Sequence, residues 1–282
     1  MRILIDRRTL LGQSVVAALV LPARARAQAI SAWDQIATTG KIRFGMYPNQ
    51  SPYNFTIDGK SYGFRLSMAR DCAEKLGKKM GRSLEVEEVP SSLQTIVLDI
   101  QANRIDVHMG LTVTEERQKA VDMFGPIYLM PVAAFSRTGF APLRHWEDLD
   151  KTGIKVSVLQ GSTDETAARE RLKNVSFRGF KNAGEVLLDV ISGNADAAVM
   201  GLLLGMNGAK QNSNIGNIVP LEPLFAPPSG GAARKDGDGR LTAFLQEWAT
   251  DLQASGRAAE LILESMKDAG LDVGKLPPNT KF

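Results

Sequence analysis

The feature that most constrains the fold is an alternation of strand and helix patterns that occurs twice along the chain. The first series has helix patterns at 66–80 and 93–100 between strand patterns at 42–46, 84–89 and 105–110. The second series has helix patterns at 165–172 and 183–191 among strand patterns at 154–158, 175–180, 195–200 and 217–221. Because a helix between two strands favours a parallel pair with a right-handed crossover, each series predicts an α/β unit with a parallel sheet.

An extended segment separates the two series. Residues 128–135 include a proline and show no helical spacing, so we interpret them as a strand that crosses between the units. Prolines at several positions between 220 and 228 indicate the return crossing. Two helix patterns follow, at 241–254 and 258–266, with Gly256 between them.

The predicted fold class is therefore α/β, with two lobes joined by two extended hinge crossings. Residues 30–128 form the first part of lobe 1, residues 129–222 form lobe 2, and residues 223–282 return to lobe 1 with the C-terminal helices. Two lobes on two crossings imply hinge closure over a cleft. Two α/β domains with a rigid interface are the alternative, which composition does not exclude.

Residues 1–29 are predicted to be an export signal that is removed. A basic start is followed by an apolar run at 10–21 and by small residues that suit a cleavage site. The pair Arg7 and Arg8 resembles the twin-arginine export motif, with an ordinary secretory signal as the alternative. We therefore expect a periplasmic protein, since no later apolar stretch is long enough to span a bilayer.

Charge and residue counts exclude several classes of function. The whole chain has a net charge of +3. The part after the predicted signal, residues 30–282, has 29 basic and 30 acidic residues, so no basic surface for nucleic acid is expected. Cys72 is the only cysteine, which rules out an intrachain disulfide. With His108 and His145 as the only histidines, neither a His/Cys metal cluster nor a cofactor site is predicted.

The first candidate binding motif is Thr112 to Arg117, directly after the strand pattern at 105–110. Open α/β sheets bind ligands at the carboxyl ends of their strands. An arginine at that edge can hold a carboxylate through two parallel charged hydrogen bonds, and Thr112 can add a hydroxyl. The alternative is a solvated arginine at the start of a surface helix.

The second candidate motif is Gly161, Ser162 and Thr163, between the strand pattern at 154–158 and a helix. Ser162 or Thr163 can cap the helix, and free N–H groups at a helix start favour an anion. The motif lacks the long glycine loop and lysine that nucleotide phosphates require. If the lobes face each other, both motifs can hold one carboxylate from opposite sides, which would favour the closed form.

These motifs and their order resemble the polar amino acid binding proteins of ATP-driven importers, solute-binding protein family 3. The resemblance covers nearly all of the chain after the signal, and its markers are Ser51 to Phe55, Asp58–Gly59, Gly63–Phe64, Ile105 to Val107, Thr112 to Arg117, Val121 to Tyr128, Gly161 to Thr163 and Ser192 to Ala197. It implies the type II periplasmic binding protein fold and a membrane permease as partner. It also implies a small carboxylate or amino acid as ligand, and we expect a monomer.

The resemblance assigns roles to individual residues. It places the carboxylate-binding arginine at Arg117, and the accompanying backbone and hydroxyl contacts at Gly110, Thr112, Ser162 and Thr163. Aromatic cover over the ligand would come from Tyr53, with Phe55 or Tyr47 nearby. Core packing is the alternative role for these rings, and it is the favoured role for Phe55.

Departures from the family pattern affect the ammonium end of the ligand. Members that bind α-amino acids usually carry an aspartate where this chain has Gly201, and Arg65 and Ser67 occupy a segment where aspartate is common. A buried ammonium needs a charged or hydrogen-bonding partner. The ammonium site is therefore lost or relocated, and Asp164 is the nearest replacement.

We expect a binding protein rather than an enzyme, namely the substrate-binding protein of an ABC importer. An organic acid without an α-ammonium is the alternative ligand. Relatives that are cyclohexadienyl dehydratases remove water and carbon dioxide from a prephenate-like acid, and they need a general acid in the cleft. Gly201 offers no such side chain, so that activity is the less favoured interpretation.

Overall fold

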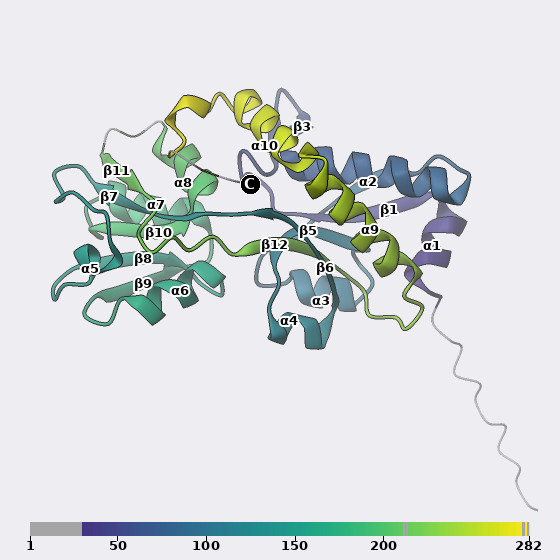
Figure 1. The fold of residues 1–282 in the computed structure, drawn as a ribbon, viewed down its shortest axis with the longest axis horizontal. Coiled ribbons are helices and arrows are strands. Elements are labelled where there is room, and N and C mark those ends of the chain that lie inside the picture. The colour runs from purple at the N-terminus through teal and green to yellow at the C-terminus, as the bar shows by residue number, and fades with distance from the viewer. Residues whose placement is uncertain (1–29, 211, 213, 278–279, 281) are drawn as a thin grey trace, which may run out of the picture.

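The computed structural model describes residues 30–210, 212, 214–277, 280 and 282, and the predicted export signal lies outside this range. Two α/β lobes lie side by side, and each is built on a five-stranded sheet (Figure 1). Two extended segments connect the lobes through the middle of the molecule. The prediction of a two-lobed α/β fold is confirmed.

The first sheet has the strand order β4-β1-β5-β12-β6. Its strands are β1 (Lys41–Met46), β4 (Glu85–Pro90), β5 (Val107–Thr112), β6 (Asp122–Leu129) and β12 (Pro228–Ala233). Its helices are α1 (Ala32–Thr39), α2 (Phe64–Met80), α3 (Ile96–Gln101), α4 (Glu115–Ala120), α9 (Arg240–Ala254) and α10 (Arg257–Asp268). In Figure 1, α2, α9 and α10 lie above this sheet, and α3 and α4 lie below it.

The second sheet has the strand order β11-β7-β10-β8-β9. Its strands are β7 (Val132–Arg137), β8 (Lys155–Leu159), β9 (Ser176–Phe180), β10 (Ala197–Gly201) and β11 (Ile215–Val219). Its helices are α5 (Trp146–Leu149), α6 (Thr163–Arg171), α7 (Ala183–Ile191) and α8 (Leu202–Ala209). A small hairpin, β2 (Phe55–Ile57) and β3 (Lys60–Tyr62), and a 3-10 turn, η1 (Val273–Lys275), complete the elements.

The crossing between the lobes differs from the expected single strand at 128–135. β6 ends at Leu129 in the first sheet and β7 begins at Val132 in the second, so Met130 and Pro131 connect two separate strands. Pro131 lacks a backbone N–H and cannot continue a hydrogen-bonded ladder, which explains the break. The return segment, 220–227, leads into β12. The exact predicted lobe boundaries stay predictions.

The expectation of purely parallel sheets was too simple. β1 pairs in parallel with β4 and β5, and β8 pairs in parallel with β9 and β10. β12 runs antiparallel to both β5 and β6, and β7 runs antiparallel to β10 and β11. β12 was missed because its glycines and alanines do not have the β-branched composition that indicates a strand.

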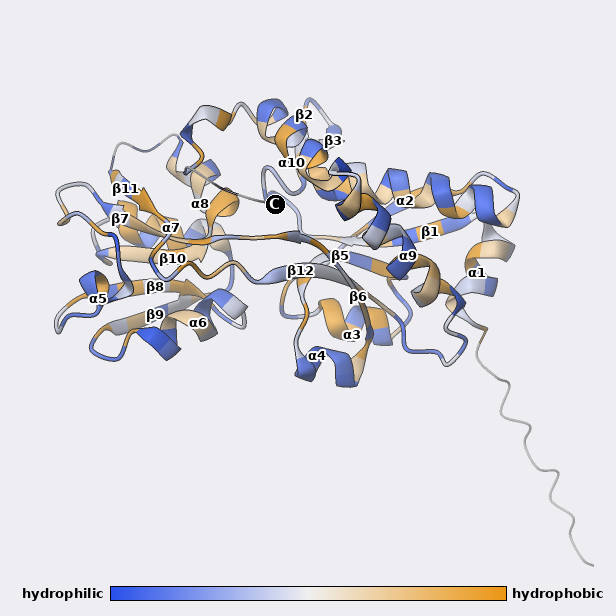
Figure 2. Ribbon diagram, viewed as in Figure 1, coloured by the Kyte–Doolittle hydropathy of each residue, from blue (hydrophilic) through white to orange (hydrophobic). Residues whose placement is uncertain are grey.

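Apolar residues concentrate inside the two layers. Figure 2 shows hydrophobic residues along β7, β10 and β11 and on parts of the helices of both lobes. The largest buried cluster includes Phe44, Phe124 and Trp248, and the Trp248 indole donates a 2.7 Å hydrogen bond to Asp71. A separate buried cluster in the second lobe surrounds Trp146. The largest cluster also includes Phe135 and Leu202 of the second lobe, so apolar packing continues from one lobe to the other in this arrangement.

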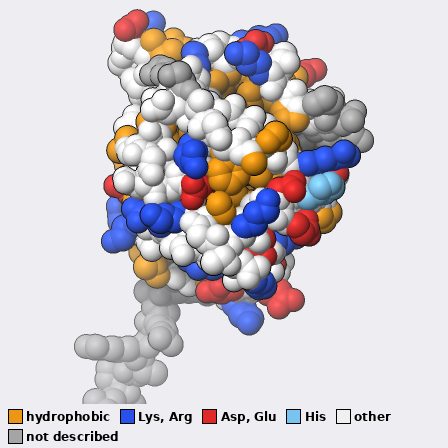
Figure 3. Space-filling view, turned by 90° about the vertical axis from the view of Figure 1, so that its left-hand side faces the viewer, with side chains coloured by type: hydrophobic (Ala, Val, Ile, Leu, Met, Phe, Trp, Pro, Cys, Tyr) orange, Lys and Arg blue, Asp and Glu red, His pale blue; other side chains and the backbone are white. Residues whose placement is uncertain are grey.

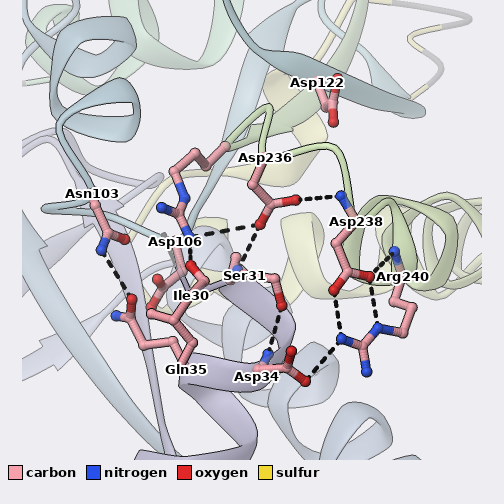
Figure 4. Close-up of polar contacts among 12 residues, drawn as sticks. Ile30, Ser31, Asp34, Gln35, Asn103, Asp106, Asp122, Asp236, Asp238 and Arg240 are labelled. Carbon is pink, nitrogen blue, oxygen red and sulfur yellow. Dashed lines mark hydrogen bonds and ion pairs between the residues drawn. The ribbon is translucent and has the colours of Figure 1, made fainter. Parts of the chain in front are cut away.

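Polar contacts hold the first described residues against the segment that precedes α9 (Figure 4). The backbone N–H of Ala32 donates to Asp236 at 2.6 Å, and the Arg234 guanidinium donates to the Ile30 carbonyl at 2.8 Å. Arg240 donates to Asp34 at 2.8 Å. Each carboxylate in these contacts accepts a hydrogen bond, and the contacts together hold α1 against the segment before α9.

The two lobes touch one another at several points. The Thr112 and Thr163 hydroxyls are 3.2 Å apart, and Gln94 donates to the Lys181 carbonyl at 3.2 Å. Lys210 of the second lobe donates to the Ala269 carbonyl beyond α10 at 3.1 Å. The arrangement described is therefore a closed one.

The outer surface is that of a charged, polar protein. Figure 3 shows charged side chains of both signs around a smaller hydrophobic area at the end of the second lobe. Within the described residues, none of the helices has the length and apolar character needed to cross a membrane.

Replacing Gly205 of α8 by alanine should destabilise the second lobe. A Cβ at this position would overlap the ring of the fully buried Phe135 on β7. Overpacking of this kind lowers the free energy of unfolding by about 1–3 kcal/mol. The higher helix propensity of alanine offsets only about 1 kcal/mol of that loss. Urea unfolding measures the difference. Gly184→Ala in α7 is the matched control, because that position is exposed and has room for a Cβ; equal stability of the two variants would contradict the packing.

Candidate functional site

A cavity of about 110 Å³ lies between the two lobes. All eight residues predicted for the site line it: Tyr47, Tyr53, Gly110, Thr112, Arg117, Ser162, Thr163 and Gly201. Further lining residues are Gln50, Arg65, Leu93, Leu111, Tyr128, Met130, Leu159, Asp164, Leu204, Pro227 and Ser229. The tertiary structure thus brings the two predicted motifs to one place, although their contact with a ligand stays a prediction.

Arg117 reaches the cavity from α4 of the first lobe. Thr114 caps this helix by accepting a 3.2 Å hydrogen bond from the Arg117 backbone N–H. The Arg117 guanidinium then turns back and donates to the Thr112 carbonyl at 2.8 Å, at the end of β5. Burial lowers the pKa of Arg117, while Tyr47, Glu116 and Asp164 oppose that shift. The group is a half-buried cation just after the end of β5.

Ser162 and Thr163 approach the cavity from the second lobe at the start of α6. The Ser162 hydroxyl accepts from the Glu165 backbone N–H at 3.0 Å and donates to the Leu159 carbonyl at 2.7 Å. Its side chain is therefore engaged in capping the helix. The Thr163 hydroxyl faces Thr112 of the first lobe at 3.2 Å, so this side chain lies at the contact between lobes.

Asp164 occupies the space beside Gly201. A Cβ on Gly201 would lie 3.8 Å from the Asp164 Oδ2 and 3.6 Å from the Tyr53 hydroxyl. Burial raises the pKa of Asp164 to about 6, against the opposing effects of the Gly201 N–H, the Thr163 hydroxyl and Arg117. The Asp164 carboxylate therefore lies beside position 201 in the cavity, and its role as the replacement ammonium partner stays a prediction.

Arg65 is the main cavity residue that the sequence analysis did not assign to the site. It is 5% exposed and lies in the first turn of α2, with its guanidinium 4.8 Å from the ring centres of both Tyr47 and Tyr53. It donates to Gln50 at 3.3 Å and to the Gly110 carbonyl at 3.4 Å. A Cβ on Gly110 would come within 2.8 Å of the Arg65 Nε, so the glycine makes room for this arginine.

Aromatic side chains form one wall of the cavity. Tyr47 stacks on His108 with ring centres 4.7 Å apart, and burial raises the pKa of Tyr47 to about 12. Burial also lowers the pKa of His108 to about 3, so the ring is neutral and its Nδ1 donates to the Gly45 carbonyl at 2.8 Å. Tyr128 packs edge-on against Phe64. This wall adds no charge at neutral pH, which leaves Arg65, Arg117 and Asp164 as the ionisable groups other than tyrosines that line the cavity.

Some residues that line the cavity could have been recognised from the sequence and others could not. Arg65 stands out in the sequence as an arginine at an apolar helix start where relatives commonly have aspartate, and that departure was the available signal. Tyr128, Ser229 and Met130 carry no such signal, because strand residues near a crossing show the same pattern whether they face a cavity or a core.

Comparisons with known proteins agree with this architecture. The family model described as bacterial extracellular solute-binding proteins, family 3, matches residues 42–266. A probable histidine-binding protein of Campylobacter jejuni is 26% identical over 174 residues, which cover 60% of this chain and 63% of that protein, less than two thirds of its length. Cyclohexadienyl dehydratase of Pseudomonas aeruginosa is 29% identical over 188 residues, which cover 64% of this chain and 67% of that protein.

A solved structure gives the same result. The ancestral amino acid-binding protein AncCDT-1, described as a precursor of cyclohexadienyl dehydratase, matches with a TM-score of 0.72 and 30% identity. The match covers 83% of this chain and 99% of that chain. The span of the family model and the shared two-lobed fold confirm the resemblance read from the motifs: the chain belongs to family 3 of the bacterial extracellular solute-binding proteins.

Proposed function

We propose that this protein is the periplasmic substrate-binding protein of an ABC importer and captures a small carboxylate-bearing ligand, an amino acid or a related compound, by hinge closure. The observation that carries the proposal is the placement of Arg117 and Asp164, which face one cavity from opposite lobes. A ligand that contacts both lobes favours the closed form by its higher affinity for that form.

The charges of the cavity support an α-amino acid over an organic acid without an ammonium. Arg117 is suited to a carboxylate, because a guanidinium and a carboxylate form paired charged hydrogen bonds. Asp164 is suited to an ammonium, which would replace the solvation that burial removes from its carboxylate. One α-amino acid therefore supplies the partner that each of these two groups needs.

Relatives support the proposed partners. A protein of Chlamydia trachomatis named as a probable ABC transporter arginine-binding protein, ArtJ, is 28% identical over 162 residues. We propose that the closed form docks on a membrane permease, and that the protein acts as a monomer.

A thermal-shift screen of the chain from residue 30 onward tests the function. A ligand at about a hundred times its dissociation constant adds about 2.7 kcal/mol to the free energy of unfolding. For a protein of this size we expect a rise in Tm of roughly 5–10 °C with one or more α-amino acids. Matched acids without the ammonium, and matched amines without the carboxylate, serve as controls. If no carboxylate raises Tm, the proposed function is wrong.

A second candidate function has one observation in its favour. Asp164 is an acid inside the cavity with a pKa of about 6, so it could donate a proton to a leaving hydroxyl group. Loss of that hydroxyl as water, together with carbon dioxide from a prephenate-like acid, is the cyclohexadienyl dehydratase reaction. We favour binding, and expect no turnover when prephenate is incubated with the protein. Turnover that is lost in Asp164→Asn would establish the enzyme instead.

A further inference from the structure

We propose that the ligand carries a second acid group, which Arg65 holds, so that the substrate class of the cavity is the acidic amino acids. This inference rests on the proposed function and narrows it. Three charged groups line the cavity, namely Arg65, Arg117 and Asp164. Two carboxylates and one ammonium on a single small ligand would match them group for group.

The burial of Arg65 is the first argument. Arg65 is only 5% exposed, yet its hydrogen bonds to Gln50 and Gly110 are long, at 3.3 and 3.4 Å, and the oxygens of Gln50, Gly110 and Tyr128 that it contacts are all neutral. Its Nε has no hydrogen-bond partner among the described residues. Arginine is almost never fully buried unless it is paired, because a buried charge without a counter-charge is costly. An anion in the cavity would supply that counter-charge.

The position of Arg65 in its helix is the second argument. α2 begins at Phe64, so Arg65 lies in the first turn of a 17-residue helix. The N-terminal end of a helix carries partial positive charge and favours anions, and a cation there is unfavourable. Arg65 therefore lies where the helix dipole disfavours a cation. The backbone N–H groups of Phe64 and Arg65 donate to the Pro52 and Tyr53 carbonyls, so the guanidinium is the group at this helix start that could hold an anion in the cavity.

The two arginines reach the cavity at neighbouring points along β5. Arg65 donates to the carbonyl of Gly110, and Arg117 donates to the carbonyl of Thr112, two residues further along the strand. Neither of these hydrogen bonds uses a carboxylate, so each guanidinium can still pair with one. A ligand with two acid groups would supply a carboxylate to each arginine.

The tyrosines fix the direction in which Arg65 can bind. Its guanidinium lies 4.8 Å from the ring centre of Tyr47 and 4.8 Å from that of Tyr53. Contact with ring faces leaves the N–H groups along the edge of the guanidinium plane, where a planar carboxylate can accept two of them. The alternative role for Arg65 is structural, in which it only holds the two rings in place.

Calorimetry with L-glutamate and L-glutamine separates these two roles, because the ligands differ only in the charge of the side-chain end. The wild-type chain from residue 30 onward should bind L-glutamate at least about tenfold more tightly than L-glutamine. Arg65→Gln should lower the affinity for L-glutamate by about tenfold or more and reduce the preference to near unity. Arg70→Gln, an exposed arginine on the same helix, should leave the preference unchanged.

Each other result contradicts the inference. A structural role predicts that Arg65→Gln weakens both ligands equally. If Arg65→Gln fails to fold, as judged by its Tm and circular dichroism, the test depends on the wild-type protein alone. Its preference for L-glutamate over L-glutamine then supports or contradicts the acidic ligand. L-Glutamine bound as tightly as L-glutamate, or a rise in Tm with neutral or basic amino acids but with neither L-glutamate nor L-aspartate, overturns the acidic ligand and leaves carboxylate capture intact. If no carboxylate raises Tm in the thermal screen, both this inference and the proposed function are wrong.

Discussion

Replacing Arg117 by alanine should weaken ligand binding by about 2–5 kcal/mol, a rise in Kd of roughly 30- to 5000-fold. The guanidinium is half-buried at the end of β5 and is oriented by its 2.8 Å hydrogen bond to the Thr112 carbonyl. Without it, the ligand carboxylate would enter the closed cavity with no charged partner at that point, and its desolvation would not be offset. Calorimetry with the amino acid that raises Tm most measures the loss.

The fold should survive this change, which makes the result easy to interpret. Arg117 forms no ion pair with a carboxylate among the described residues, and the backbone hydrogen bond from its N–H to Thr114 is kept in the variant. Lys119→Ala is the control, because Lys119 is an exposed cation on the same helix. Both variants should retain the Tm of the ligand-free protein within a few degrees. An unchanged Kd in Arg117→Ala would contradict the carboxylate site.

Ligand affinity should fall as the pH is lowered through about 6. Burial raises the pKa of Asp164 to about 6, so this carboxyl is ionised at neutral pH and protonated in acid. A ligand ammonium binds the ionised form, and below the pKa it must displace a proton first. The affinity should therefore be constant above about pH 7 and fall by up to tenfold per pH unit below about pH 6.

Asp164→Asn isolates the contribution of this group. The variant should bind an α-amino acid about tenfold or more weakly at neutral pH, and its affinity should no longer depend on pH in this range. Calorimetry between about pH 5 and about pH 8 measures both effects. The opposite sign, in which affinity rises as the pH falls, is expected of an organic acid without an ammonium, because protonation then removes a carboxylate that repels the ligand. An affinity that rises as the pH falls would therefore support an organic acid without an ammonium as the ligand, in place of an α-amino acid.

Much of the fold follows from local sequence patterns. The apolar spacing from Leu66 to Met80, closed by Gly81, corresponds to α2, and the strand pattern at 42–46 corresponds to β1. These elements are predictable because periodicity and helix caps involve neighbouring residues. β12 was not predictable in this way, since its glycines pack against Phe124 and its strand character comes from pairing with β5 and β6.

The two-lobed α/β organisation and the position of Arg117 after a strand could be predicted from the amino-acid sequence, since both depend on local order along the chain. Which charged groups meet depends on how the two lobes pack. Arg65, at the start of α2, and Asp164, at the start of α6, line the same cavity as Arg117, and Gly110 leaves room for the Arg65 guanidinium. Their chemistry depends on burial, which removes water from Asp164 and raises its pKa, and which leaves the Arg65 Nε without a hydrogen-bond partner among the residues that the structure describes. Burial is a property of the packed lobes, so no pattern of neighbouring residues contains it.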